Sequence, residues 1–131
     1  MSRFLLDSDV IIWHLRGREE VTGMLRVLQR YGLPRCSAIS ILEVEIGMKK
    51  HEEEKTRRFL KGIKVFDVTR EVASKAAQLV REHKAKGRTF GLGDAIIAGT
   101  CLLNNLVLVT YNQKHYPIED MEFYPVPALK F

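Results

Sequence analysis

Short apolar runs alternate along the chain with longer stretches whose apolar residues have helical spacing. The runs that we expect to form strands are residues 3–6, 35–38, 64–68, 106–110 and 122–126. The stretches that we expect to be helical are residues 10–15, 19–31, 39–50, 51–62, 69–87 and 94–105. This alternation predicts an α/β fold with a central, mainly parallel sheet of four to five strands flanked by helices.

Signals within some of these segments refine their placement. Residues 106–110 are almost entirely apolar, so we expect this strand to be buried on both faces of the sheet. The last strand is expected at a sheet edge, because Pro125 cannot donate a hydrogen bond to a neighbouring strand. Thr69 has the side chain of a helix N-cap residue, and Gly87 is a typical stop at a helix C-terminus.

The composition is that of an ordinary globular protein. The 131 residues fit one domain spanning residues 1–131. Hydrophobic residues make up 46% and charged residues 28%, which excludes a disordered chain. No apolar stretch reaches the roughly 18–20 residues that span a bilayer, and the N-terminus lacks the pattern of a signal peptide. We therefore expect a cytoplasmic protein with no membrane partner. Cys36 and Cys101 are too few for a disulfide framework, so they are expected to be reduced and buried.

Acidic residues stand at unexpected places in apolar surroundings. Asp7 and Asp9 interrupt the run FLLDSDVII. Asp7 comes at the carboxyl end of the first expected strand, where ligands bind in open parallel sheets. It could equally be a helix cap, and Asp9 is better explained as a cap or a supporting residue.

Glu43 and Asp94 also allow structural and functional interpretations. Glu43 lies on an apolar helix face without a cation, but Ser40 and Glu43 together fit a capping box. Asp94 is in the first turn of its helix, where the helix dipole favours an acid. Gly91 and Gly93 just before it would allow a close approach of the backbone or a sharp turn.

The coincidence of three such acids suggests a metal site. Asp7 follows a strand, and Glu43 and Asp94 lie near the starts of later helices, so a parallel sheet can gather them along one edge. Carboxylates gathered in this way repel one another unless a cation lies among them. Oxygen ligands without a His or Cys cluster suit Mg²⁺ or Mn²⁺.

Four motifs, each weak alone, follow one another along nearly the whole chain. They are FLLDSDVII, SAISILEVEIG, GDAIIAGT and LVLVTYNQKHY. In these motifs the chain resembles the PIN-domain ribonucleases, and in particular the VapC-type toxins of toxin–antitoxin pairs. The resemblance implies a PIN-like three-layer fold with a twisted central sheet.

The resemblance also implies roles for individual residues. Asp7, Glu43 and Asp94 match the catalytic acids that bind metal in this family. Asn112 matches an Asn that supports the site from the loop after the fourth strand, and Thr110 begins the same motif as a further supporting residue.

Two residues differ from the pattern of the family. Asp9 stands where the family often has Asn or Ser. His115 stands where many members carry a fourth acid, in the pattern Thr–x–Asn–x–x–acid–Phe. Histidine can bind Mn²⁺ but is a poor ligand for Mg²⁺, so His115 leaves a second metal position open. It either lies near the site or contacts metal, water or phosphate.

The implied activity is metal-dependent hydrolysis of RNA phosphodiester bonds. The three acids would hold a Mg²⁺ or Mn²⁺ ion, which activates water and orients the scissile phosphate. The products implied by the resemblance carry a 5′-phosphate and a 3′-hydroxyl. The implied partners are an RNA substrate, a cognate antitoxin protein that covers the acidic site, and a second copy in a homodimer.

Basic residues lie next to the acids in the sequence. The net charge is +5 and the sequence pI about 9.4, which favours polyanionic partners. Four candidate RNA-binding residues lead toward Asp94; these are Arg81, Lys84, Lys86 and Arg88. Cations at the end of a helix also complement its dipole, which is the purely structural explanation.

Two other functions fit parts of the sequence. A haloacid dehalogenase-type phosphatase would use Asp7 as nucleophile and Asp9 as acid/base, but Ala98 stands where its later second acid is needed. A degenerate PIN domain that binds RNA or a partner without cleavage is suggested by His115. Cleavage that requires metal and Asp7 separates the nuclease from both.

Overall fold

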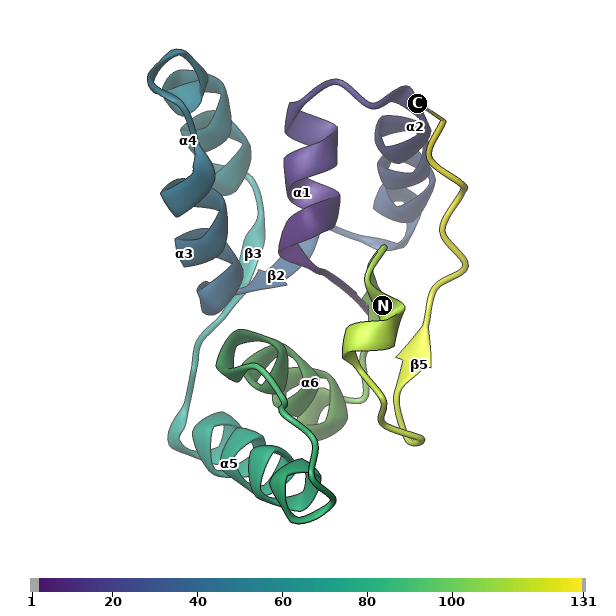
Figure 1. The fold of residues 1–131 in the computed structure, drawn as a ribbon. Coiled ribbons are helices and arrows are strands. Elements are labelled where there is room, and N and C mark those ends of the chain that lie inside the picture. The colour runs from purple at the N-terminus through teal and green to yellow at the C-terminus, as the bar shows by residue number, and fades with distance from the viewer. Residues whose placement is uncertain (1–2, 131) are drawn as a thin grey trace.

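Five short strands form the centre of the molecule in the computed structural model, which describes residues 3–130 (Figure 1). The strands are β1 (Phe4–Leu6), β2 (Arg35–Ser37), β3 (Lys64–Phe66), β4 (Val107–Val109) and β5 (Glu122–Phe123). Hydrogen bonds join β1, β4 and β5 in that order and join β2 to β3, and every one of these pairings is parallel. Because β2 packs beside β1, the strand order across the sheet is β3-β2-β1-β4-β5. The expected parallel sheet is confirmed, with shorter strands than the apolar runs suggest.

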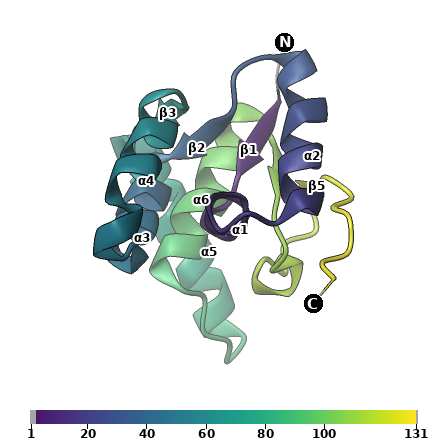
Figure 2. The ribbon, with the colours of Figure 1, turned by 90° about the horizontal axis from the view of Figure 1, so that it is seen from above.

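Helices cover both faces of this sheet. They are α1 (Ser8–Leu15), α2 (Glu19–Leu28), α3 (Ala38–Gly47), α4 (Glu53–Lys61), α5 (Arg70–Ala85) and α6 (Leu92–Asn104), with short 3₁₀ turns η1 (Gln29–Tyr31), η2 (Lys50–Glu52) and η3 (Gln113–His115). Figure 1 shows α5 and α6 together on one side, with α1 to α4 on the other. Seen from above, α1 lies between the α3–α4 pair and α2 (Figure 2).

Successive side chains of β1 point to opposite faces of the sheet, and they contribute to two separate parts of the hydrophobic core. Leu5 packs with Leu79 and Ile97, from α5 and α6. Its neighbour Leu6 packs with Val10 and Val21 from α1 and α2. Successive side chains of a strand point to opposite faces, so the short apolar run contributes to both helical layers.

The expected helix boundaries at residues 69–87 are confirmed by their caps. The Thr69 hydroxyl accepts a hydrogen bond from the Val72 N–H at 3.1 Å. Gly87 follows the end of α5 with φ +73°, a conformation that suits glycine. The α5 helix packs closely on α6 at Gly99, where a Cβ atom would lie 3.2 Å from the Val72 carbonyl oxygen.

Other expectations differ from the structure in detail. The capping box proposed for Ser40 and Glu43 is wrong, because α3 begins at Ala38 and its N-cap is Ser37. The Ser37 hydroxyl accepts from the Ile39 N–H at 3.2 Å. Cys36 and Cys101 are buried free thiols as expected. Within residues 3–130, no helix combines the length and apolar character required for crossing a bilayer.

Candidate active site

Three carboxylates from distant parts of the sequence lie near one another at one edge of the sheet. Asp7 directly follows β1 and is the N-cap of α1, Glu43 is in α3, and Asp94 is in the first turn of α6. Burial raises the pKa of Glu43, and the Asp7 and Asp94 carboxylates raise it further. The three groups are therefore close enough to repel one another, as the sequence hypothesis requires.

Asp7 is a buried carboxylate, and both of its oxygens accept hydrogen bonds. Its Oδ1 atom accepts from the Ser8 N–H at 2.8 Å. Its Oδ2 atom accepts from the Thr110 hydroxyl at 2.8 Å and from the Tyr116 hydroxyl at 2.9 Å. The alternatives of helix cap and site residue are thus both compatible with its position, and Thr110 lies directly against the carboxylate.

Tyr116 joins two of the acids, although the sequence did not identify it as a site residue. Its buried hydroxyl lies 2.9 Å from Asp7 Oδ2 and 3.3 Å from Asp94 Oδ1. Burial, together with both carboxylates, raises the pKa of the phenol far above its usual value, so Tyr116 is a hydrogen-bond donor at neutral pH. The sequence signal that could have identified it is its place in the pattern Thr–x–Asn–x–x–acid–Phe. Tyr116 occupies the Phe position of this pattern and adds a hydroxyl to the aromatic ring.

Besides Tyr116, His115 also lies near the Asp94 carboxylate. The His115 Nδ1 atom lies 3.7 Å from Asp94 Oδ2, and the imidazole is exposed. Burial raises the pKa of Asp94, as does Asp7, whereas His115 and the Tyr116 hydroxyl lower it. His115 therefore lies at the border of the acidic group.

One oxygen of the Glu43 carboxylate has no partner, although the Ser8 side chain lowers the pKa of this group. Its Oε1 atom is buried without a hydrogen-bond partner. A Cβ atom at position 93 would lie only 3.0 Å from Glu43 Oε2, so Gly93 is needed for this close approach. The expectation that a glycine before Asp94 permits close backbone approach is confirmed for Gly93.

Asp9 serves a different purpose from the three acids. Its Oδ2 atom accepts from the Tyr111 N–H at 2.8 Å and from Asn112 Nδ2 at 3.2 Å, and its Oδ1 atom accepts from the Val10 N–H at 2.8 Å. Burial and the Asp7 carboxylate raise the pKa of Asp9 to about 6. The side chain thus fixes the loop after β4, and it is not the free acid/base that a phosphatase would need.

The chemistry of the acidic group fits a hard divalent cation. All of its candidate ligands are oxygens, and one buried oxygen, Glu43 Oε1, has no other partner. In residues 3–130, however, no three His, Cys, Asp or Glu side chains are arranged closely enough to hold a metal ion as they stand. Binding would therefore require side-chain movements that bring the carboxylates closer together.

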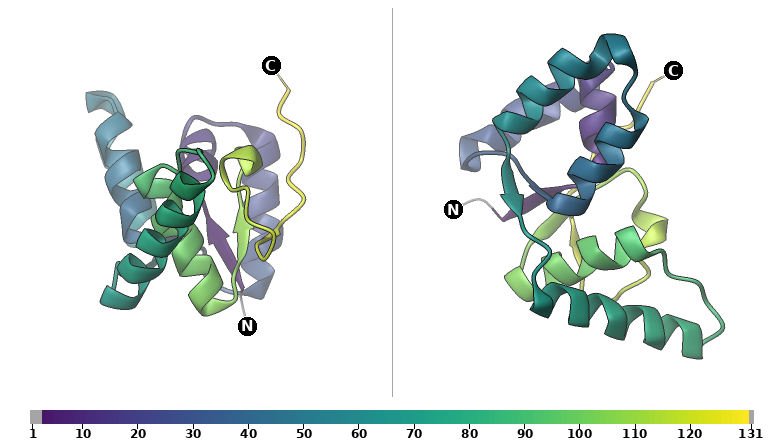
Figure 3. Two further views of the ribbon diagram at one scale, coloured as in Figure 1. Left: turned by 60° about the horizontal axis from the view of Figure 1, so that its bottom comes forward. Right: turned by 90° about the vertical axis from the view of Figure 1, so that its left-hand side faces the viewer.

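The four candidate RNA-binding residues lie around the end of α5. Arg81 and Lys84 are in its last turns, Lys86 is its C-cap, and Arg88 is in the connection to α6. All four are exposed. Figure 3 shows how this connection leads from the end of α5 to the start of α6, the helix that carries Asp94.

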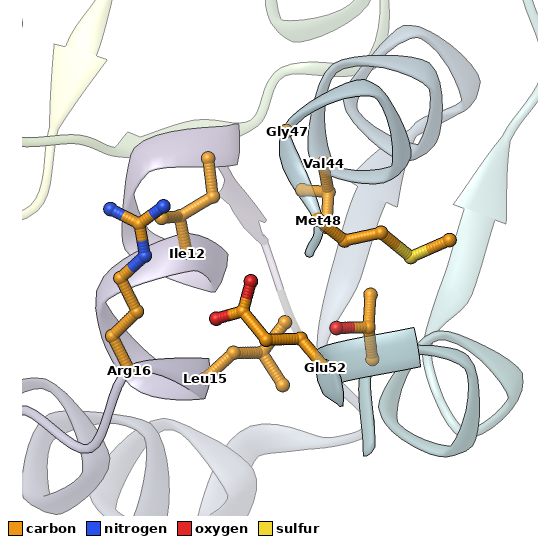
Figure 4. Close-up of a pocket in the computed structure, with 8 residues that line it drawn as sticks. Ile12, Leu15, Arg16, Val44, Gly47, Met48 and Glu52 are labelled. Atoms are coloured by element: carbon orange, nitrogen blue, oxygen red, sulfur yellow. The ribbon is translucent and has the colours of Figure 1, made fainter. Parts of the chain in front are cut away.

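A separate shallow pocket lies between α1, α3 and α4 (Figure 4). Apolar side chains, including Ile12, Leu15 and Val44, form most of its wall, with Arg16 and Glu52 at its polar part. None of its lining residues is a predicted site residue. This pocket is therefore distinct from the acidic group.

Comparisons with known proteins bear on the family and the fold of the chain. The PIN domain family matches residues 4–120. Ribonuclease VapC10 of Mycobacterium tuberculosis is 33% identical over 114 residues, which cover 87% of this chain and 86% of that protein. A toxin-antitoxin complex from Klebsiella pneumoniae has a TM-score of 0.72 at 30% identity, over 88% of this chain and 92% of that chain. DNA-bound VapBC from Salmonella typhimurium is similar in fold, with a TM-score of 0.83 at 23% identity over 95% of this chain and 98% of that chain.

Proposed function

The chain belongs to the PIN-domain family, and from this premise we propose that it is a metal-dependent endoribonuclease, the toxin of a type II toxin–antitoxin pair. The PIN-like fold expected from the sequence is confirmed. The proposal is carried mainly by one observation, the proximity of three acids from distant segments: the Tyr116 hydroxyl contacts both Asp7 and Asp94, and Glu43 Oε2 lies against Gly93. The ribonuclease name of the M. tuberculosis relative supports the same activity.

Asp7, Glu43 and Asp94 would hold a Mg²⁺ or Mn²⁺ ion. When bound, such an ion supplies Lewis-acid polarisation of a phosphate oxygen and a more acidic water. Burial and mutual repulsion raise the pKa of both Glu43 and Asp94. Ligands must be deprotonated to bind a cation, so we expect metal affinity to increase with pH.

Neighbouring residues would keep the acids and the adjacent loop in place. Thr110 donates to Asp7, and Asp9 fixes the loop that carries Asn112. His115, which lies 3.7 Å from Asp94 with an exposed ring, would contact water or a phosphate group.

RNA would be bound by the basic end of α5. Exposed lysine and arginine side chains attract phosphates and release counterions, so binding should weaken as salt rises. The residues concerned are Arg81, Lys84, Lys86 and Arg88.

Two protein partners belong to the proposal. Solved relatives are described as toxin–antitoxin complexes, which supports a cognate antitoxin for this chain. We also propose a homodimer, which predicts a mass in solution of twice the 15.1 kDa chain, measurable by light scattering.

The activity is tested by cleavage of a mixed RNA pool with Mg²⁺ or Mn²⁺. We expect Asp7→Asn, Glu43→Gln and Asp94→Asn each to reduce the rate by about a hundredfold or more, because each removes a charged ligand, and EDTA to abolish it. Glu45→Gln is the matched control. It lies on the same helix, roughly 200° around the axis from Glu43, and should cleave normally.

Two outcomes of this experiment would contradict the proposal. RNA that is bound but never cut with either metal would contradict the nuclease and favour a binding module, the alternative suggested by His115. Cleavage that survives both EDTA and Asp7→Asn would contradict the metal mechanism.

A further inference from the structure

One hydroxyl group, that of Tyr116, lies within hydrogen-bond distance of two of the proposed metal ligands. We propose that Tyr116 is a positioning residue whose hydroxyl hydrogen is shared between Asp7 and Asp94 and keeps these two carboxylates beside each other, which favours binding of the cation once the acids move closer together. The distances are 2.9 Å to Asp7 Oδ2 and 3.3 Å to Asp94 Oδ1. This inference rests on the proposed function, because it assigns Tyr116 to the same site.

Packing alone does not explain the hydroxyl. The Tyr116 side chain is 2% exposed and belongs to the core cluster on the α5–α6 face, with its ring 6.4 Å from that of Phe123. A phenylalanine would fill the same space without a hydroxyl group. A buried hydroxyl is costly unless it is hydrogen-bonded, and the partners that this hydroxyl finds are the two acids.

The hydrogen bonds leave other carboxylate oxygens available. Tyr116 engages Asp7 Oδ2 and Asp94 Oδ1. Asp7 Oδ1 accepts from the Ser8 N–H at 2.8 Å and from the Ser8 hydroxyl at 3.5 Å, a long contact that rotation of the hydroxyl can release. Asp94 Oδ2 lies toward His115 at 3.7 Å. Each acid therefore keeps an oxygen with which to bind a cation while Tyr116 fixes the other.

Tyr116 contacts both Asp7 and Asp94, an arrangement that we call the bridge, and this distinguishes it from Thr110. Two neighbouring carboxylates repel each other, and a hydrogen placed between them offsets part of that repulsion. The Thr110 hydroxyl contacts Asp7 at 2.8 Å, so it orients one acid without linking it to the second. Partners that orient metal ligands typically change metal affinity by about 10- to 100-fold.

The experiment compares Mn²⁺ binding, by calorimetry and by electron paramagnetic resonance, in the full chain and in Tyr116→Phe. We expect the variant to bind Mn²⁺ about tenfold more weakly and to need correspondingly more Mn²⁺ for half-maximal RNA cleavage. At saturating Mn²⁺ its kcat should return close to the original value, because the metal ligands themselves are intact. Thermal unfolding without metal checks that the variant is folded.

Two further variants test the bridge itself. Thr110→Val should weaken Mn²⁺ binding less than Tyr116→Phe, because the Thr110 hydroxyl contacts only Asp7 among the three proposed metal ligands. Tyr124→Phe is the matched control, since its ring packs against Phe4 at 5.3 Å on the other core cluster; it should bind Mn²⁺ normally.

The outcomes separate this inference from the proposed function. Unchanged or tighter Mn²⁺ binding in Tyr116→Phe would overturn the positioning role while the nuclease proposal stands. A reduction in Thr110→Val equal to that in Tyr116→Phe would overturn the bridge. If the unaltered protein binds no Mn²⁺, the proposed metal function fails, and the role of Tyr116 fails with it.

Discussion

Gly93 shows how a single residue can control the acidic group without belonging to it. A Cβ atom at this position would lie 3.0 Å from Glu43 Oε2. The atom that must move is the end of a flexible side chain, so the fold can adjust at low cost. The carboxylate, however, would be displaced from its place near Asp7 and Asp94.

We predict that Gly93→Ala lowers the rate of metal-dependent RNA cleavage on the order of tenfold to a hundredfold, since small displacements of a catalytic group have effects of this size. The thermal unfolding midpoint of the Gly93→Ala variant should fall only slightly, or rise.

Gly23→Ala is the control, because nothing lies within 4 Å of a Cβ at this position in α2. It should stabilise the protein by about 0.5–1 kcal/mol and leave cleavage unchanged. Normal cleavage by Gly93→Ala would contradict the assignment of Glu43.

Asp9 provides a prediction about pH. The fold raises the pKa of Asp9 from 3.8 to about 6, so the folded protein binds this proton more tightly than the unfolded chain does. The contribution of Asp9 to the free energy of unfolding is therefore largest below about pH 4 and is lost as pH rises through 6. Its size is on the order of 3 kcal/mol, from the free energy equivalent of a pKa shift.

We predict that lowering the pH from 7 to 4.5 stabilises the metal-free protein to urea through Asp9, against the opposing effect of His14, whose pKa is lowered by burial, and that Asp9→Asn reduces this gain. Part of this pH dependence should remain in the variant, because the pKa values of Glu43 and Asp94 are also raised. An unchanged slope in Asp9→Asn, measured by urea unfolding in EDTA, would show that Asp9 does not titrate in this range.

At the level of residues, the sequence could identify the acids but not their contacts. Asp7, Glu43 and Asp94 stood out because each interrupts or borders an apolar segment. Tyr116 did not stand out, because a tyrosine among apolar residues is normally a core residue. Its hydrogen bonds connect positions separated by 109 and 22 residues, and no local pattern predicts such contacts.

At the level of elements, the end of α5 is the place where RNA binding can be tested. Lys84 and Arg88 are exposed there. We predict that Lys84→Gln/Arg88→Gln weakens binding of single-stranded RNA and reduces the slope of log K against log salt by about 0.7 for each phosphate that the variant no longer neutralises. Arg57→Gln/Lys61→Gln on α4 is the control, because it removes the same charge from two exposed residues of another helix. Equal effects of both pairs, measured by fluorescence anisotropy, would indicate general charge attraction only.

Helices and strands were predictable wherever a local signal was strong. Thr69 and Gly87 mark the ends of the α5 region because a side-chain cap and a positive φ are local properties. The start of α6 was placed two residues late, since its N-cap, Gly91, has no side chain to act as a signal. The capping box at Ser40 failed because Ser37, three residues earlier, already caps α3.

At the level of the whole molecule, topology explains why distant acids meet. In the parallel pair β1–β4, Leu6 is opposite Val109, so the residues that follow, Asp7 and Thr110, emerge at the same sheet edge. Alternating strands and helices predict this kind of convergence. They do not predict how far each helix is rotated, which decides whether Glu43 and Asp94 point to Asp7.

The central claim is that these three carboxylates bind one divalent cation together. Crystals soaked in Mn²⁺ and measured at a wavelength that gives anomalous scattering from manganese test it most directly. The account predicts a peak about 2 Å from oxygens of Asp7, Glu43 and Asp94, which disappears in Asp7→Asn crystals. A fully occupied manganese site elsewhere, with these three side chains unmoved and without metal, would contradict it.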